Sequence, residues 1–157
     1  MNYKYAAGIL IYTFINQKSY ILLGEDQYGM LSDFGGKNEK YDNCVSDTAV
    51  RECHEETCGC IGSVSFLNFK CINSSYIISK TYYKKPYYMY ICYIRYDQNI
   101  TNQFKIARKF LYNKNAEIKY LEKISLKWVL LEDMFENQDY MRNMFKDTIN
   151  NNKNIIL

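Results

Sequence analysis

Long hydrophobic runs broken by short polar segments cover most of the chain and predict β-strands. Residues 3–14 and 19–23 are rich in β-branched and aromatic side chains, and they predict two neighbouring strands. Three similar runs follow Gly62 and predict interior strands of a mixed sheet. These runs are residues 63–71, 76–83 and 86–96.

Two other segments have apolar residues at helical spacing. The first predicts a helix from about residue 44 to 57, with Asp42 or Asn43 as its N-cap and Gly59 just beyond its end. Its apolar stripe consists of Val45, Ala49 and Cys53. The second predicts a helix over residues 101–113. Its expected inner face consists of Phe104, Ala107, Phe110 and Leu111, and its expected outer face of Lys105, Arg108 and Lys109.

The C-terminal part predicts a short strand at residues 124–130 and a final helix from about Asp133. The asparagine-rich end, 151–157, is expected to fray. With 157 residues, 48% of them hydrophobic and 24% charged, the chain has enough apolar side chains for one domain, expected over residues 1–150.

Charge and cysteine content exclude several classes of protein. A net charge of +3 is too small to indicate nucleic-acid binding by itself, although it allows a local basic patch. Neither an 18-residue apolar run nor a signal-peptide pattern is present, which predicts a soluble, cytoplasmic protein without membrane contact. The six cysteines lack C-x-x-C spacing, so we expect them to be reduced and structural.

The most informative stretch runs from Phe34 to Gly59 and combines a glycine pair with three glutamates. Glu52, Glu55 and Glu56 are spaced i, i+3 and i+4, so their carboxylates share one face of the predicted helix. Like charges at this density require a compensating cation, and a hard divalent ion such as Mg²⁺ or Mn²⁺ suits oxygen ligands. The glycine pair before the helix allows close backbone approach or a positive φ.

This stretch resembles the Nudix box, G-x5-E-x7-R-E-U-x-E-E-x-G-U, in which U is a bulky aliphatic residue. The matching positions are Gly36, Arg51, Glu52, Cys53, Glu55 and Glu56. The flanking segments L-L-G-E and K-W-V-L-L-E-D-M also look like those of the family, so the resemblance covers nearly the whole chain. It implies a Nudix-type α/β/α sandwich with a mixed β-sheet between helices.

The match departs from the family pattern in two places. The segment from Gly36 to Arg51 is one residue longer than in the pattern, and the loop glutamate is absent. Counting forward puts Asp42 in its place, whereas counting back puts Asn43 there. In addition, the closing glycine comes one position late, at Gly59, which concerns the end of the helix rather than the glutamates.

The resemblance implies metal-dependent hydrolysis of a nucleoside diphosphate linked to another group. The implied metal ligands are Glu52, Glu55, Glu56 and the carbonyl oxygen of Gly36. Arg51 would orient the glutamates rather than contact the substrate. A further acid in the family often comes from a later loop; Glu122 is the nearest candidate and Glu117 the other, unless these are only surface acids beside Lys119 and Lys123.

Basic and aromatic residues suggest where the substrate binds. The segment from Lys80 to Arg95 contains four cations, six tyrosines and no acid, a composition that suits base stacking and phosphate contacts. The same composition also suits ordinary tyrosine-rich strands with solvated lysines. The candidate substrate-binding residues are Lys37, Lys84, Lys85 and Arg95.

Three functions remain open at this point. The phrase L-S-D-F-G-G-K looks like Nudix enzymes of large DNA viruses, including poxvirus-type mRNA-decapping enzymes, which are generally longer; capped RNA is therefore the preferred substrate. The second function is hydrolysis of nucleoside triphosphates, dinucleoside polyphosphates, nucleotide sugars or diphosphoinositol polyphosphates. The third is a non-catalytic Nudix binding module, which the intact glutamates disfavour.

Overall fold

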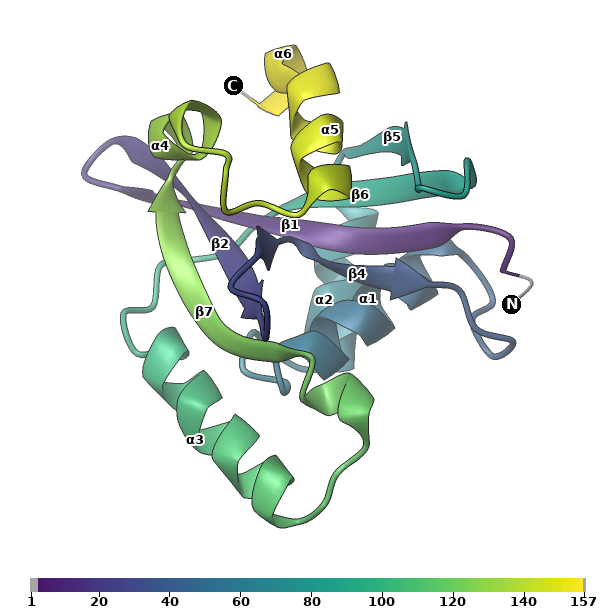
Figure 1. Ribbon diagram of the computed structural model, residues 1–157, viewed down its shortest axis with the longest axis vertical. Helices are drawn as coiled ribbons and strands as arrows, with labels where there is room; N and C mark the ends of the chain where they lie inside the picture. The colour runs from purple at the N-terminus through teal and green to yellow at the C-terminus, as the bar shows by residue number, and fades with distance from the viewer. Residues whose placement is uncertain (1–2, 157) are drawn as a thin grey trace.

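The computed structural model describes residues 3–156, and over this range a mixed β-sheet has helices on both sides (Figure 1). The strands are β1 (Ala6–Ile15), β2 (Lys18–Asp26), β3 (Leu31–Ser32), β4 (Phe34–Lys37), β5 (Tyr76–Lys80), β6 (Pro86–Tyr93) and β7 (Lys123–Leu130). The helices are α1 (Val45–Glu56), α2 (Val64–Ile72), α3 (Ile100–Asn113), the 3₁₀ helix η1 (Ile118–Tyr120), α4 (Leu131–Glu136), α5 (Asn143–Asn151) and α6 (Lys153–Ile156). The expected α/β sandwich with a mixed sheet is confirmed.

Strand β1 is the centre of the sheet. The strand order is β3-β2-β1-β6-β5, with β4 paired to the start of β1 and β7 paired to β2. β1 runs parallel to β6 and antiparallel to β2 and β4. Because both faces of β1 are covered, its sequence is an almost continuous apolar run rather than an alternating one.

Two hydrophobic cores lie on opposite faces of β1. Ile9 and Ile11 pack in the core under α1 and α2, whereas Leu10 packs in the core under α4 and α5. Figure 1 shows the same division, with α5 and α6 on one side of β1 and α1 and α2 on the other. Burial of each of these side chains contributes about 1.5–3 kcal/mol to folding.

The strand predicted at residues 63–71 is wrong, because this segment forms helix α2. The Ser63 side chain caps the helix by accepting a hydrogen bond from the Phe66 backbone N–H at 3.2 Å. Leu67 and Cys71, four residues apart, are the buried positions of the helix. Apolar residues on its outer side, such as Phe69, made the segment resemble a buried strand.

The single C-terminal helix predicted from Asp133 is also wrong. The helix begins at Leu131 and ends at Glu136, and the chain resumes as α5 and α6. Between α4 and α5 the backbone pairs with the edge of the sheet, where Leu31 N–H donates to Tyr140 O at 2.8 Å and Arg142 N–H donates to Leu31 O at 2.9 Å. The segment expected to fray contains α6, and its last residue lies outside the described range.

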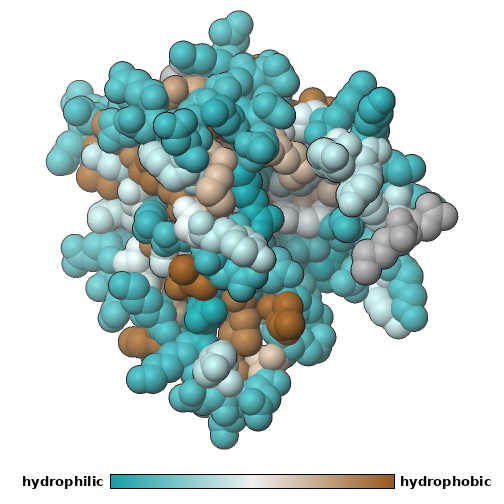
Figure 2. Space-filling model, in the orientation of Figure 1, coloured by the Kyte–Doolittle hydropathy of each residue, from teal (hydrophilic) through white to brown (hydrophobic). Residues whose placement is uncertain are grey.

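Helix α3 packs against β7, but its faces differ from those predicted. Phe104 is buried as expected, whereas Phe110 is 60% exposed. Arg108, expected to face outward, donates from Nε to the Lys123 carbonyl at 2.7 Å. Figure 2 shows hydrophobic residues gathered on the lower part of this face, in the region of α3.

All six cysteines are free, as expected. Among residues 3–156, no helix has both the length and the apolar character needed to cross a membrane.

Candidate active site

Helix α1 brings the three glutamates to the point where β4 leaves the sheet. The predicted apolar stripe of the helix packs in the hydrophobic core, where Ala49 and Cys53 are fully buried. Glu55 and Glu56 are buried as well, and Glu52 lies one turn earlier beside Gly36. The helix bounds, Val45–Glu56, agree with the prediction to within one residue at each end.

The glycine pair of β4 is required by close approach rather than by backbone conformation. A Cβ atom on Gly36 would lie 2.5 Å from the carboxyl carbon of Glu52, so a larger residue would displace that glutamate. A Cβ atom on Gly35 would lie 2.7 Å from the Cα of Gly8 on the neighbouring strand. The expected alternative, a positive φ, applies to Gly29 and to glycines after α1, not to this pair.

Asp42, not Asn43, is the acid that pairs with Arg51. The guanidinium donates from Nε to Asp42 Oδ1 at 3.0 Å and from Nη2 to Asp42 Oδ2 at 3.0 Å, a bidentate pair. Asn43 instead donates its backbone N–H to Asp47 Oδ2 at 3.0 Å. The loop with one extra residue therefore keeps an Arg–carboxylate brace, using the shorter aspartate arm.

The same guanidinium connects the brace to the glutamates. Arg51 Nη1 donates to Glu52 Oε1 at 2.9 Å and to Glu55 Oε2 at 3.2 Å. Its Nη2 also donates to the Lys37 carbonyl at 2.9 Å, which ties α1 to the end of β4. The second oxygen of Glu55, Oε1, lies 3.1 Å from Lys119 Nζ.

A buried lysine that the sequence analysis did not single out neutralises the third glutamate. Lys123, at the start of β7, is only 3% exposed. Its Nζ donates to Ser32 Oγ at 2.7 Å and lies 3.4 Å from Glu56 Oε1. The other oxygen of Glu56 accepts the Gly35 N–H at 2.9 Å. No local sequence signal marks this lysine, because the pairing joins positions 67 residues apart in the sequence.

A second buried acid, Asp33, lies near the same lysine. It accepts a hydrogen bond from the Tyr87 hydroxyl, and burial raises its pKa to about 6 although this bond and the charge of Lys123 oppose the rise. The layer beneath the glutamates is therefore a polar network inside the sheet rather than an apolar core.

Burial also raises the pKa of two of the glutamates. The pKa of Glu52 rises to about 7, with the neighbouring charges of Glu55 and Glu122 adding to the effect and Arg51 opposing it. Burial raises the pKa of Glu56 to about 8, against the charge of Lys123. Burial therefore favours the uncharged forms of Glu52 and Glu56, although the nearby charges of Arg51 and Lys123 oppose this effect.

The glutamate cluster opens into a pocket of about 630 Å³. Its lining consists of Tyr3, Gly35, Gly36, Lys37, Asn38, Glu39, Glu52, Glu122 and Arg142. Glu122 is thus placed beside Glu52, whereas Glu117 is on the surface, 3.8 Å from Lys119. Lys37 also lines the pocket. Arg142 was not anticipated, because it reaches the pocket only through the irregular segment between α4 and α5.

The other basic candidates are not part of the pocket lining. Lys84 and Lys85 lie in the turn between β5 and β6, near the start of β1. Arg95 follows the opposite end of β6, which is roughly 20 Å away at about 3.3 Å per strand residue. The structure therefore does not bring Arg95 to the glutamates.

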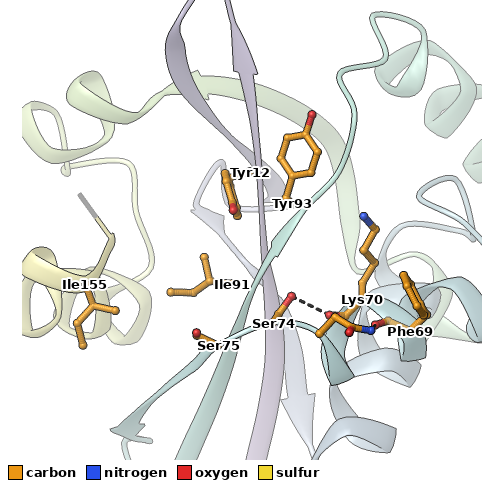
Figure 3. Close-up of a pocket in the computed structure, with 9 residues that line it drawn as sticks. Tyr12, Phe69, Lys70, Ser74, Ser75, Ile91, Tyr93 and Ile155 are labelled. Atoms are coloured by element: carbon orange, nitrogen blue, oxygen red, sulfur yellow. Dashed lines mark hydrogen bonds between the residues drawn. The ribbon is translucent and has the colours of Figure 1, made fainter.

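A separate hollow of about 410 Å³ lies towards that opposite end of the strands. Figure 3 shows Tyr12, Ile91 and Tyr93 on the strands, with Phe69 and Lys70 of α2 on one side and Ile155 on the other. No carboxylate lines it among the described residues. It therefore lacks the donors needed for metal-assisted phosphate chemistry, and the glutamate pocket is the candidate active site.

The donor set fits a hard divalent cation, although the side chains are not gathered around one point. Among residues 3–156, no three His, Cys, Asp or Glu side chains are arranged to hold a metal ion together. Each glutamate is instead bound to a cation of the chain. Burial raises the pKa of Glu52 and Glu56, and a bound Mg²⁺ or Mn²⁺ with oxygen ligands would stabilise their charged forms.

Comparison with known proteins gives a clear result for the fold. No protein-family model and no curated protein matches the sequence. A C. elegans Ap4A hydrolase in a binary complex is similar in structure, with a TM-score of 0.62, 16% identity, and coverage of 96% of this chain and 97% of that one. The Nudix hydrolase RenU of M. smegmatis gives a TM-score of 0.61 at 12% identity, with coverage of 99% and 88%.

The NUDIX domain of Shewanella oneidensis NrtR, in complex with ADP ribose, gives a TM-score of 0.60 at 14% identity, with coverage of 100% of this chain and 90% of that one. At sequence identities this low, the comparison shows only that the folds are similar. The likeness spans nearly the whole chain in each case, and the fold of this chain is that of the Nudix hydrolases.

Proposed function

We propose that the protein is a metal-dependent pyrophosphohydrolase that cleaves the diphosphate linkage of a nucleoside diphosphate derivative. One observation carries this proposal: Glu52 and Glu122 share a pocket with Lys37 and Arg142. Carboxylates suited to a divalent cation thus lie beside cations suited to phosphate oxygens. This arrangement of charge is complementary to a metal–diphosphate complex.

Each group of residues has a distinct role in the proposed reaction. The proposed metal ligands are Glu52, Glu55, Glu56 and the carbonyl oxygen of Gly36. A bound Mg²⁺ or Mn²⁺ neutralises phosphate charge and makes water a better nucleophile. Arg51 stays paired with Asp42 and positions the helix that carries the glutamates.

The remaining pocket residues bind the substrate and move the proton. Lys37 and Arg142 bind the non-bridging phosphate oxygens. Glu122 accepts a proton from the attacking water while a bond from the water oxygen to phosphorus forms and the bridging P–O bond breaks. The leaving phosphate takes the electron pair of the broken bond.

Capped RNA is the preferred substrate. The support is the resemblance of L-S-D-F-G-G-K to viral decapping enzymes and the basic turn at Lys84 and Lys85 near the start of β1. The alternative is a small nucleotide derivative, which the structural similarity to an Ap4A hydrolase and to a Nudix domain in complex with ADP ribose favours. In either case the reaction and the metal ligands are the same.

A substrate panel tests the proposal. Capped RNA, free cap analogue, nucleoside triphosphates, Ap4A, ADP-ribose and diphosphoinositol polyphosphates are incubated with Mg²⁺, Mn²⁺ or EDTA. We expect metal-dependent release of a phosphorylated product, and Glu55→Gln should lower kcat at least about a hundredfold. Glu117→Gln is the matched control, because this acid is 76% exposed and should leave kcat unchanged.

Two outcomes would contradict the proposal. A fully active Glu55→Gln protein would remove the proposed metal site. Absence of turnover across the whole panel would favour a non-catalytic binding module. Cleavage of capped RNA but not of the free cap analogue would select RNA over the small-molecule alternative.

A further inference from the structure

The tip of the β5–β6 hairpin is attached to the rim of the glutamate pocket. The Thr81 hydroxyl lies 2.9 Å from the Tyr3 hydroxyl, and Tyr3 lines the pocket. Lys37, which also lines the pocket, has its Nζ 5.3 Å from the centroid of the Tyr3 ring and 5.9 Å from that of Tyr83. A phosphate bound by Lys37 would therefore lie next to the ring of Tyr83.

The tip has a fixed backbone conformation and presents two exposed aromatic rings. Thr81 N–H donates to Lys85 O at 2.8 Å, and Lys84 N–H donates to Thr81 O at 2.8 Å. On this closed turn Tyr82 is 88% exposed and Tyr83 is 66% exposed. Their rings are perpendicular, with centroids 5.4 Å apart, so each ring keeps a face open to solvent.

The charged residues close to the two tyrosines in the sequence all have the same sign. The chain contains no Asp or Glu between Glu56 and Asp97, and the tip itself carries Lys84 and Lys85. Exposed aromatic rings beside cations bind planar, anionic ligands by stacking and by charge attraction. A nucleotide is a ligand of this kind, whereas an inositol phosphate has no base to stack.

We propose that Tyr82 and Tyr83 form a nucleobase-binding subsite, on which an unpaired base of the substrate stacks while the attached phosphates pass Lys37 into the glutamate pocket. The binding of the phosphates in this subsite rests on the proposed function. The subsite requires a nucleoside polyphosphate as substrate, whose base belongs either to the 5′ end of an RNA or to a free nucleotide.

Equilibrium binding tests the subsite without requiring turnover. Isothermal titration calorimetry in Mg²⁺ compares β,γ-imido-GTP with tripolyphosphate, which carries the phosphates without a base. In Tyr82→Ala/Tyr83→Ala protein, the Kd of the nucleotide should rise about tenfold or more, equivalent to about 1.4 kcal/mol, while the Kd of tripolyphosphate stays unchanged. Tyr82→Phe/Tyr83→Phe should retain nucleotide binding, because the ring faces remain.

Phe110→Ala is the matched control, since it removes an exposed ring far along the sequence on α3. Unchanged nucleotide binding in the double alanine variant, or an equal loss for tripolyphosphate, would overturn the subsite. A 5′-triphosphate trinucleotide distinguishes the sources of the base: a larger loss for it than for the mononucleotide assigns the subsite to RNA, and an equal loss assigns it to free nucleotides.

The two proposals fail in different ways. Hydrolysis on the panel together with normal binding by the tyrosine variants would overturn only the subsite. Base-dependent binding without hydrolysis of any substrate would support the subsite and overturn the proposed reaction.

Discussion

Removal of divalent metal should make the stability of the protein fall steeply between about pH 5 and pH 8. Burial raises the pKa of Glu56 from 4.5 to about 8 and that of Glu52 from 4.5 to about 7. When the pKa of a carboxyl is higher in the folded protein than in the unfolded chain, the stability is unaffected at pH values below the pKa of the unfolded chain. Stability is lost as the pH rises from that pKa to the pKa in the folded protein. The loss therefore develops between about pH 4.5 and pH 8.

The magnitude follows from the larger of the two pKa changes. A rise from 4.5 to about 8 for Glu56 corresponds to about 5 kcal/mol, at about 1.4 kcal/mol per pH unit. The charges of Glu52 and Glu56 interact, so their effects are not additive, and about 5 kcal/mol is taken for the pair. For a domain of this length, 1 kcal/mol shifts Tm by about 2–4 °C, so Tm should fall by about 10–20 °C.

Asp33, whose pKa burial raises to about 6, adds to the loss in the lower part of this pH window, whereas two other acids do not contribute to it. Hydrogen bonds from Arg51 and the backbone lower the pKa of Asp42 in spite of its burial, and the backbone and Arg142 do the same for Asp26. A carboxylate whose pKa is lower in the folded protein stabilises it at pH values above the pKa of the unfolded chain. This stabilisation is lost as the pH falls through the pKa in the folded protein. Both contributions are therefore constant between pH 5 and pH 8.

Thermal unfolding measured by circular dichroism at pH 5, 6, 7 and 8 provides the assay, once in EDTA and once in excess Mg²⁺. Bound metal stabilises the charged carboxylates, so Tm should depend much less on pH in Mg²⁺. In EDTA, Glu56→Gln should remove a large part of the pH dependence. A Tm that is constant from pH 5 to pH 8 in EDTA, or that falls equally in both buffers, would refute the reasoning.

Two further substitutions examine the supports of the glutamates. Arg51→Lys keeps the charge but loses the bidentate pair with Asp42, and we expect urea unfolding to show a loss of about 1–3 kcal/mol; additive effects with Asp42→Asn would contradict a direct pairing. Lys123→Met removes the buried ammonium beside Glu56, whose pKa of about 8 keeps it mostly uncharged below that pH. The free energy of unfolding in EDTA should therefore fall by up to about 3 kcal/mol more at pH 10 than at pH 6, and an equal loss at both pH values would show that the lysine does not compensate this charge.

The sequence was sufficient to predict the central helix and its charged face. Apolar residues at every fourth position fix which side of α1 is buried, and the spacing of Glu52, Glu55 and Glu56 then fixes where the carboxylates lie. Strand β1 was also predictable, since a strand covered on both faces is apolar throughout. These features depend on local periodicity, which a single sequence records directly.

The features that the sequence did not predict depend on tertiary contacts. Residues 63–71 are apolar enough for a strand, and only packing against α1 and β6 shows that two of their residues, Leu67 and Cys71, face the core of a helix. Counting along the loop left Asp42 and Asn43 as equal candidates for the partner of Arg51. The geometry of the guanidinium selects Asp42, because both of its carboxylate oxygens accept a hydrogen bond.

The three glutamates, equivalent in the motif, have different environments in the folded chain. Both oxygens of Glu56 are occupied, one by the Gly35 N–H and one by Lys123, whereas Glu52 faces the pocket and is bound only through Arg51. Rotation of Glu52 away from Arg51 breaks one ion pair, whereas separation of Glu56 from Lys123 leaves the buried ammonium group of the lysine without its carboxylate partner. We therefore expect Glu52 to make the first contact with an entering cation, and Glu56 to hold the base of the cluster in position.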